Sequence, residues 1–188
     1  MGRRGRCRDV TDPSSFRIGL ISDTHGLLRP EAVGFLRGAD HIVHAGDVGS
    51  AAILEALGAL APVSAVRGNN DTAAWAAQLP LIERLRIGGL AVLLVHELAE
   101  LQSLAGPVGE PPADIVVYGH SHQPRILEQA GRLCVNPGSA GPRRFKLPIA
   151  AGEILIEAGG SQVRLVDLTS APPRELYHTL IGSHNLLI

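Results

Sequence analysis

Polar side chains able to bind a metal ion recur along this chain at nearly regular intervals. Imidazole and carboxylate ligands without a thiolate suit Mn, Fe, Zn, Co or Ni. The pair His120 and His122 alone would equally suit a phosphate, so the interpretation depends on the whole set. Successive groups lie 22 to 27 residues apart, each behind a short apolar run, and comprise Asp23, His25, Asp47, Asn69, His96, His120 and His122.

Strands and helices must carry these groups to one place. Apolar runs rich in branched side chains predict strands over residues 16–21, 40–44, 63–66, 90–95 and 114–117. Helices are expected over residues 28–37, with Pro30 near the start, and 50–57, with Ser50 as N-cap and Gly58 at the end. One β-α-β step has about this length, so parallel strands would bring the polar groups to one edge of a sheet.

Hairpins predominate in the second half of the chain. Three short turns, Gly88-Gly89, Ala130-Gly131 and Gly159-Gly160, each separate two apolar runs. These runs cover residues 81–87 and 90–95, 125–129 and 132–135, and 153–157 and 162–168. A helix is expected over residues 97–104 and a loop over 107–112. The order predicts an α/β fold with a largely parallel sheet and antiparallel additions.

The composition is typical of one globular domain. The chain has 188 residues, of which 45% are hydrophobic and 3% aromatic, so aliphatic side chains must fill the core. A net charge of −1 argues against general nucleic-acid affinity. Cys7 and Cys134 offer neither a disulfide framework nor a zinc spacing, and we therefore expect a cytoplasmic location. No apolar run has the length of a membrane span.

Both ends of the chain are expected to lie outside the domain, which we place at residues 16–170. Residues 1–15 hold several arginines and predict a disordered leader, with a nucleic-acid-binding arm as the alternative. Pro172 and Pro173 separate a C-terminal tail, residues 171–188. Its last apolar residues are expected to pack on the core or on a neighbouring subunit, so a homo-oligomer stays open.

The order of the polar motifs resembles the calcineurin-like metallophosphoesterase superfamily. The family pattern is Asp-x-His, Gly-Asp, Gly-Asn-x-(Asp or Glu), His and Gly-His-x-His. This chain matches it, over residues 16–168, with Asp23-Thr24-His25, Gly46-Asp47, Gly68-Asn69-Asn70-Asp71, His96 and Gly119-His120-Ser121-His122. The small size, residues 22–26 and Asn136-Pro137-Gly138-Ser139 resemble the compact bacterial and archaeal phosphodiesterase branch, to which the retromer scaffold subunit is related.

The resemblance implies a fold and a two-metal site. The fold would be a four-layer α-β-β-α sandwich of two mixed β-sheets flanked by helices, with the site at strand carboxyl ends. Two divalent ions are implied, with Mn²⁺ favoured and Ni²⁺, Zn²⁺, Fe²⁺ or Mg²⁺ as alternatives. A hydroxide held between them would attack phosphorus in line. Asp23, His25 and His122 would hold the first ion, Asn69, His96 and His120 the second, and Asp47 both; the catalytic residues would be Asp47, Asn69, Asn70 and Asp71.

Two residues depart from the family pattern. Asn70 stands where many phosphatases carry a proton-donating histidine, and an amide cannot act as an acid near pH 7. This predicts dependence on a good leaving group or on another acid. Glu97 stands where glycine is usual. It would either crowd the turn or act as an acid near the site, or face solvent and begin the next helix, which we favour.

Arginines beside the motifs are candidates for substrate contacts, because a guanidinium binds phosphate bidentately. Of Arg67, Arg143 and Arg144, we assign Arg67 and Arg143, together with Asn70, to substrate binding. The turn at residues 136–139 would either face a phosphate with its backbone N–H groups or support the site. His44 is expected to be a buried, hydrogen-bonded histidine.

The sequence therefore predicts a metal-dependent phosphoesterase, and a phosphodiesterase in particular. The expected partner is a small phosphoester substrate, with nucleic acid only as a phosphodiester substrate and no membrane. The alternative is a catalytically weak scaffold protein on the same fold. Asn70 and Glu97 favour the scaffold, whereas seven chemically competent ligand positions favour the enzyme.

Overall fold

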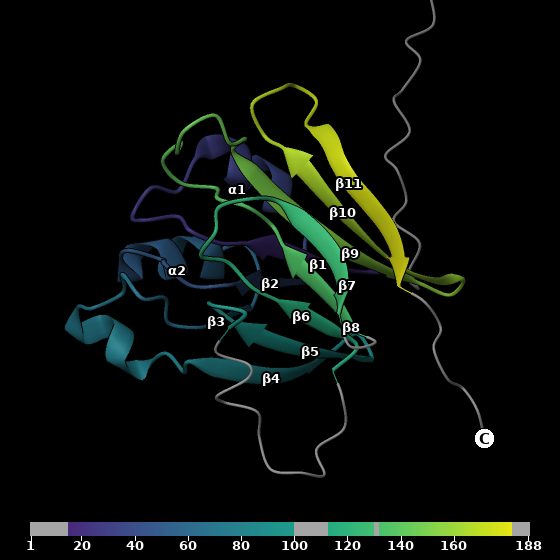
Figure 1. The fold of residues 1–188 in the computed structure, drawn as a ribbon, viewed down its shortest axis with the longest axis horizontal. Helices are drawn as coiled ribbons and strands as arrows, with labels where there is room; N and C mark the ends of the chain where they lie inside the picture. The colour runs from purple at the N-terminus through teal and green to yellow at the C-terminus, as the bar shows by residue number, and fades with distance from the viewer. Residues whose placement is uncertain (1–14, 100–112, 130–131, 182–188) are drawn as a thin grey trace, which may run out of the picture.

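Two β-sheets form the body of the protein (Figure 1). The computed structural model describes residues 15–99, 113–129 and 132–181. The six-stranded sheet has the order β11-β10-β9-β1-β2-β3, and the five-stranded sheet the order β4-β5-β6-β8-β7. The first sheet comprises β1 (Phe16–Ile21), β2 (His41–His44), β3 (Val63–Ala65), β9 (Ala150–Glu157), β10 (Gly160–Asp167) and β11 (Arg174–Ile181). The second comprises β4 (Ile82–Ile87), β5 (Leu90–Val95), β6 (Ile115–Val117), β7 (Arg125–Gln129) and β8 (Arg132–Asn136).

Both sheets are mixed, with the parallel pairs at one edge of the six-stranded sheet and at the centre of the five-stranded sheet. β1 pairs in parallel with β2, and β2 with β3. In the second sheet β6 pairs in parallel with β5 and with β8. The predicted hairpins β4-β5, β7-β8 and β9-β10 are antiparallel. The strands that precede the candidate ligands are therefore the parallel ones.

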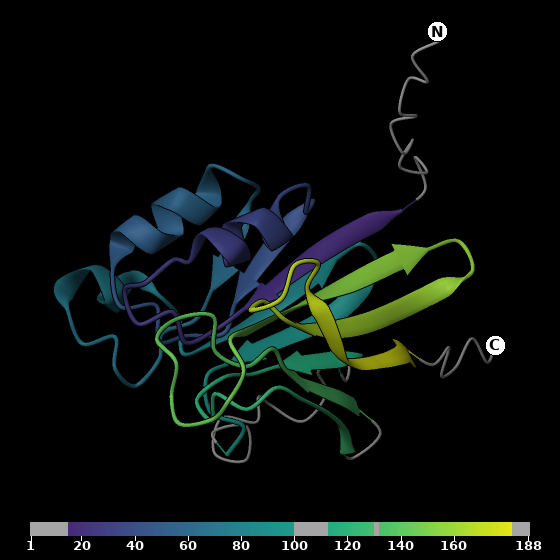
Figure 2. The same ribbon diagram turned by 90° about the horizontal axis from the view of Figure 1, so that it is seen from above.

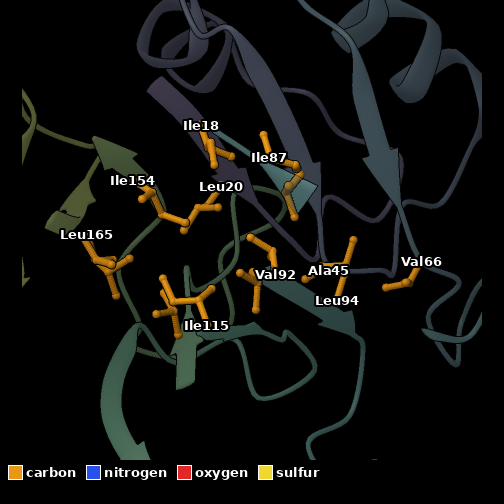
Figure 3. Close-up of a cluster of buried hydrophobic side chains, with 14 residues drawn as sticks. Ile18, Leu20, Ala45, Val66, Ile87, Val92, Leu94, Ile115, Ile154 and Leu165 are labelled. Carbon is orange, nitrogen blue, oxygen red and sulfur yellow. The ribbon is translucent and has the colours of Figure 1, made fainter. Parts of the chain in front are cut away.

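Aliphatic side chains fill the space between the sheets, as the low aromatic content requires. Ile18 and Leu20 of β1 belong to the same buried cluster as Leu94 of β5 and Ile115 of β6, and Figure 3 shows these side chains directed toward one another. All four are fully buried. Burial of each such side chain contributes about 1.5–3 kcal/mol, so this layer holds the two sheets together.

The α-helices cover the outer face of the six-stranded sheet (Figure 2). They are α1 (Pro30–Leu36) and α2 (Ala51–Gly58), and a short 3-10 helix, η1, spans Ala74–Gln78. Leu36 and Leu57 pack with Ile21 and Ile42 of the sheet in one buried cluster. The predicted sandwich of two mixed sheets with flanking helices is confirmed. None of the described helices is long and apolar enough to cross a membrane.

Two expectations about the chain path are wrong. The candidate ligands do not share one sheet edge, because they lie on two sheets. Within the described residues β-α-β steps join β1, β2 and β3, and the chain then passes through η1 and β4 before β5. The predicted tail begins at residue 171, yet β11 pairs with β10 and extends the sheet. Its polar, exposed sequence is typical of an edge strand and lacks an apolar run. The leader through residue 14 and the tail from residue 182 lie outside the described residues.

A further expectation concerns the helix over residues 97–104. Of its described part, residues 97–99, residues 98 and 99 form a turn. The remainder, and the loop expected over residues 107–112, lie outside the described residues.

Candidate metal centre

Strand ends from both sheets bring the seven candidate ligands into one cluster. Four come from the six-stranded sheet and three from the five-stranded one. Distances of 4.0 Å or less between nitrogen and oxygen atoms link all of them. Asp23 and His25 follow β1, Asp47 follows β2, Asn69 follows β3, His96 follows β5, and His120 and His122 follow β6.

The first group consists of Asp23, His25 and His122. Nε2 of His122 lies 3.3 Å from Oδ1 of Asp23 and 3.2 Å from Nε2 of His25. The two imidazole rings stack with their centroids 5.1 Å apart. Three potential ligand atoms thus face one small volume, as they would around a cation.

The second group centres on Asn69. Its Oδ1 lies 3.0 Å from Nε2 of His96 and 3.1 Å from Nδ1 of His120. Oδ2 of Asp47 lies 3.4 Å from His96 Nε2 and 3.7 Å from His25 Nε2. Asp47 therefore sits between the two groups.

An unpaired carboxylate oxygen of this cluster fits a divalent cation. Asp23 Oδ1 lies 3.3 Å from Nε2 of His122 and is buried without a hydrogen-bond partner among the described residues, which is rare for polar atoms. His96 donates from Nδ1 to the carbonyl of Ala45 at 2.7 Å, which directs Nε2 at the cluster, where its lone pair is available once the ring has lost a proton. Imidazole, carboxylate and amide donors of this kind suit a first-row divalent metal.

Burial and hydrogen bonding shift the pKa values of the candidate ligands in different directions. Burial raises the pKa of Asp23 to about 7, against the opposing hydrogen bond from Ser22. Burial also acts to raise the pKa of Asp47, but hydrogen bonds from His96 and Asn70 hold it well below its usual range. For His96, burial is outweighed by the bonds to Asp47 and Ala45, which raise its pKa to about 9.

The histidines of the first group behave differently. Burial, followed by the charge of Arg144, lowers the pKa of His122 to about 4. Burial likewise lowers the pKa of His25. Both imidazoles are therefore neutral at pH 7 and able to act as ligands, whereas His96 must release a proton first.

Left-handed backbone conformations concentrate at the cluster. A non-glycine residue in this region costs about 1–3 kcal/mol and persists where its surroundings over-determine it, often at functional sites. Among the described non-glycine residues with positive φ, five of six are candidate ligands: Asp23 (53°), His25 (44°), Asp47 (52°), His120 (67°) and His122 (57°), the sixth being Phe145.

Two motif glycines allow the loops to approach closely. A Cβ atom on Gly68 would lie 2.1 Å from the backbone nitrogen and from Oδ1 of Asp47. One on Gly119 would lie 2.1 Å from Oγ of Ser22, which donates to Asp23 Oδ2 at 2.7 Å. Any side chain at either position would displace a candidate ligand.

Asn70 and Glu97, the two departures from the family pattern, both reach the cluster. Asn70 donates to Asp47 from its backbone N–H at 2.8 Å and from Nδ2 at 2.6 Å. Oε1 of Glu97 lies 3.5 Å from Nδ1 of His120. The Glu97 side chain is 32% exposed, so its carboxylate is turned partly toward solvent, as expected, and partly toward His120. Most of the helix expected after it lies outside the described residues.

Asp71 is predicted from the sequence to be catalytic, and in the structure its carboxylate accepts hydrogen bonds from backbone N–H groups. Its Oδ2 accepts the backbone N–H groups of Val48 (3.1 Å) and Gly68 (2.9 Å), and Oδ1 accepts that of Gly49 (2.8 Å). It is 4% exposed. Asp71 thus ties the loops after β2 and β3 together.

The turn at residues 136–139 supports the cluster, which was one of its two predicted roles. Buried Asn136 donates to the carbonyl of Gly119 at 2.6 Å and to Ser121 Oγ at 3.1 Å. Ser139 donates to the carbonyl of Asp23 at 2.8 Å. The turn therefore fixes the loops of Asp23 and of His120 to each other.

The candidate substrate contacts are spread around the cluster. Arg144 is the arginine whose charge acts on His25 and His122. Arg143 lines a separate pocket nearby. The backbone N–H of Arg67 donates to the carbonyl of Pro80 at 2.9 Å, and no side-chain contact of Arg67 links it to the cluster within the described residues.

His44 lies beneath the site, fully buried, as expected. Thr24 donates its hydroxyl to the carbonyl of Val48 and so accepts a hydrogen bond from Nε2 of His44 at 2.9 Å. Nδ1 of His44 accepts the N–H of Gly46 at 3.2 Å. Burial lowers the pKa of His44 to about 4, and the neutral ring joins the loops of Asp23 and Asp47.

One supporting residue near the cluster, Arg29, is not among the residues predicted from the sequence. Arg29 donates from Nε to the carbonyl of Gly141 at 2.9 Å and so links the loop before α1 to the loop after residue 139. The only signal was its place just before Pro30, at the start of α1.

The comparison with known families decides the identity of the fold. The family model described as the calcineurin-like phosphoesterase superfamily domain matches residues 16–157. The chain belongs to this superfamily. The family implies divalent metal ions, and the cluster described above supplies candidate residues to hold them.

This superfamily member is similar in sequence to archaeal proteins and in fold to solved structures from a bacterium and a eukaryote. A probable metallophosphoesterase of Methanothermobacter thermautotrophicus is 38% identical over 134 residues, which are 65% of this chain and 76% of that protein. Vacuolar Protein Sorting 29 from Cryptosporidium parvum has a TM-score of 0.72 and 19% identity, covering 88% of this chain and 97% of its own. The phosphoesterase Yfce of E. coli has a TM-score of 0.66 and 22% identity, covering 89% and 100%. At these identities the two structures show a shared fold.

Proposed function

We propose that this calcineurin-like phosphoesterase is a phosphodiesterase that works with two divalent cations. The observation that carries the proposal is the position of Asp47, whose Oδ2 lies 3.7 Å from His25 Nε2 and 3.4 Å from His96 Nε2. A carboxylate placed between two groups of ligands is the arrangement needed to join two metal ions. Such ions, about 3.5–4 Å apart, are a common device for phosphoester hydrolysis.

The residues divide into two sets of ligands around Asp47. Asp23, His25 and His122 would hold the first cation, and Asn69, His96 and His120 the second. Mn²⁺ is our first choice, with Ni²⁺, Zn²⁺, Fe²⁺ and Mg²⁺ as alternatives, because ligand type does not separate these ions strongly. When bound, the pair supplies charge neutralisation for phosphoryl oxygens and lowers the pKa of a coordinated water to about 7.

Two neighbouring residues favour a diester over a monoester. Asn70 engages Asp47 with its side-chain amide and offers no proton for a leaving group. Glu97 places a carboxylate beside His120. A monoester is a dianion near pH 7 and is repelled more strongly by this carboxylate than a monoanionic diester is. The site therefore favours diesters with a good leaving group.

A scaffold protein with weak activity is the second candidate. It is supported by the same two residues, since Asn70 replaces a proton donor and Glu97 adds charge, and by the fold shared with Vacuolar Protein Sorting 29. The intact set of seven ligands and its unpaired buried carboxylate oxygen favour the enzyme.

The test is hydrolysis by metal-stripped protein to which Mn²⁺, Ni²⁺, Zn²⁺ or Mg²⁺ is added back. We expect metal-dependent cleavage of bis(p-nitrophenyl) phosphate that exceeds cleavage of p-nitrophenyl phosphate. Asp47→Ala serves as the control for contaminating phosphatase and should lose nearly all activity. Metal binding without turnover of either ester would overturn the proposal and leave the scaffold function in its place.

A further inference from the structure

A basic pocket of about 450 Å³ begins at the residues that follow the candidate ligand His122 in the chain. Gln123 and Pro124, which line it, directly follow His122 in the chain. Since consecutive Cα atoms are about 3.8 Å apart, the pocket begins within one or two residues of a metal ligand. The other lining residues used here are Arg143, Lys146, Asp167, Arg174 and Tyr177.

Positive charge in this pocket exceeds negative charge. Arg143, Lys146 and Arg174 line it, against the single carboxylate of Asp167. Asp167 already accepts the N–H (2.9 Å) and hydroxyl (2.6 Å) of Thr169 and is paired with Arg174 at 3.3 Å. Within the described chain, Arg143 and Lys146 form no salt bridge. Two exposed cations are thus available to an anion.

The loop that carries these cations is fixed against the metal centre. The N–H of Ala140 donates to the carbonyl of Ser22 at 3.1 Å, and a Cβ on Gly141 would lie 2.3 Å from the carbonyl oxygen of Thr24. Arg144, between the two pocket cations in sequence, acts electrostatically on His25 and His122. One loop therefore serves both the centre and the pocket.

An aromatic ring also lines this pocket. Tyr177 belongs to the edge strand β11 and is 45% exposed. An exposed aromatic ring beside arginine and lysine is the combination with which proteins bind nucleotides, the ring stacking on a base and the cations contacting phosphate.

From this juxtaposition we propose that the pocket binds a second phosphate of the substrate, carried by a nucleoside whose base stacks on Tyr177. Arg143 and Lys146 contact the second phosphate while the scissile diester lies at the metal centre. The inference rests on the proposed phosphodiesterase function and names its substrate class as nucleotide diesters that bear an additional phosphate.

Binding measurements test this without relying on turnover. The full chain, with and without Mn²⁺, is titrated with thymidine 3′,5′-bisphosphate and with thymidine 5′-monophosphate by calorimetry. We expect the bisphosphate to bind the Mn²⁺-loaded protein about tenfold more tightly, as one charge-assisted contact of about 1.4 kcal/mol would give. The double variant Arg143→Ala/Lys146→Ala should reduce this ratio to about two or less, while Tyr177→Ala should weaken both ligands by about tenfold.

Arg86→Ala is the matched control, because Arg86 is an exposed arginine that contacts only the carbonyl of Gly89 among the described residues. It should keep the tenfold ratio. Equal affinities in the unmodified protein, or a ratio that survives in the double variant, would overturn the proposal. A phosphorylated tetrathymidylate that binds more tightly than the bisphosphate would assign the second phosphate to a nucleic-acid end, and equal binding would assign it to a small nucleotide.

Hydrolysis of the p-nitrophenyl ester of thymidine 5′-phosphate, with and without a 3′-phosphate, separates the two proposals. Binding preference without hydrolysis of either ester would contradict the phosphodiesterase function and leave the pocket in place. Hydrolysis of both esters at the same kcat/KM would support the phosphodiesterase function and overturn the proposal for the pocket.

Discussion

Asn70 holds both carboxylate oxygens of Asp47, one through its backbone N–H at 2.8 Å and the other through Nδ2 at 2.6 Å. The residue that stands in the place of a proton donor therefore orients the carboxylate between the two ligand groups. Its side chain occupies a structural position in the metal centre, and the first prediction follows from this contact.

Asn70→Ala removes the Nδ2 hydrogen bond and leaves the backbone bond in place. A hydrogen bond to a charged group contributes about 1.5–3 kcal/mol when buried, and less at this partly exposed position. We expect the affinity for Mn²⁺ to fall by about fivefold, measured by calorimetry. Thr72→Ala, at an exposed neighbouring position, is the control; the same affinity in both variants would contradict the positioning role of Asn70.

The pH dependence of metal binding follows from Asp23 and His96. Burial raises the pKa of Asp23 from 3.8 to about 7. Against burial, bonds to Asp47 and Ala45 raise that of His96 from 6.5 to about 9. Both groups must lose a proton before binding a cation, so affinity for Mn²⁺ should rise from pH 6 to pH 9. Calorimetry in buffers of different ionisation enthalpy would show the released protons, and constant affinity over this range would contradict the assignment.

The stability of the metal-free protein should change in the opposite direction. A group whose pKa is higher in the folded state than in the unfolded state stabilises the folded protein at pH values below its unfolded-state pKa. This stability is lost as the pH rises through the folded-state pKa. For Asp23 and His96 the loss extends through about pH 7 and about pH 9. The Tm of the metal-free protein should therefore fall between pH 7 and pH 9. An unchanged or rising Tm would contradict the raised pKa values of Asp23 and His96.

Gly68→Ala should damage the centre. The added Cβ would lie 2.1 Å from backbone and carboxylate atoms of Asp47, and backbone cannot yield cheaply. We expect a loss of about 3 kcal/mol in unfolding free energy, or a Tm lower by about 6–12 °C, with weakened Mn²⁺ binding. Gly34→Ala is the matched control, since nothing lies within 4 Å and α1 should gain up to about 1 kcal/mol. Similar Tm values for the two variants would refute the close-approach argument.

Glu97→Gln tests whether the carboxylate near His120 acts by its charge. Its Oε1 lies 3.5 Å from Nδ1 of His120, and the side chain is 32% exposed. Removal of the charge should weaken Mn²⁺ binding by about threefold and improve the use of a monoester relative to a diester. Glu128→Gln, on the exposed face of β7, is the comparison variant. An unchanged ratio of monoester to diester hydrolysis would show that Glu97 does not set substrate charge.

The sequence alone could predict which side chains gather in the cluster, because the candidate ligands Asp23, Asp47 and His120 are side chains whose types and order do not depend on the path between them. It could not predict the path. Equal spacing suggested β-α-β steps, but the step from Asn69 to His96 contains a hairpin and passes to the other sheet. The spacing between two motifs gives the length of the connection between them, but it does not indicate which sheet the connection leads to.

The approach of Glu97 to His120 could not be predicted either. Its nearest sequence neighbours favour a helix start, whereas its partner His120 arrives on β6, from a distant part of the chain. Strand β11 escaped prediction for a related reason. Its side chains are largely exposed, so only pairing with β10 defines it.

The division of the ligands, four on one sheet and three on the other, has a mechanical consequence. Between the sheets the core is aliphatic and non-directional, and it resists separation more than sliding. At the ligand end, Asp47 from the loop after β2 and His96 from the loop after β5 would hold common ions at fixed distances. Metal loading would then act as a reversible cross-link between the two sheets, so that the same residues that gather the ions also stop the two halves of the sandwich from shearing.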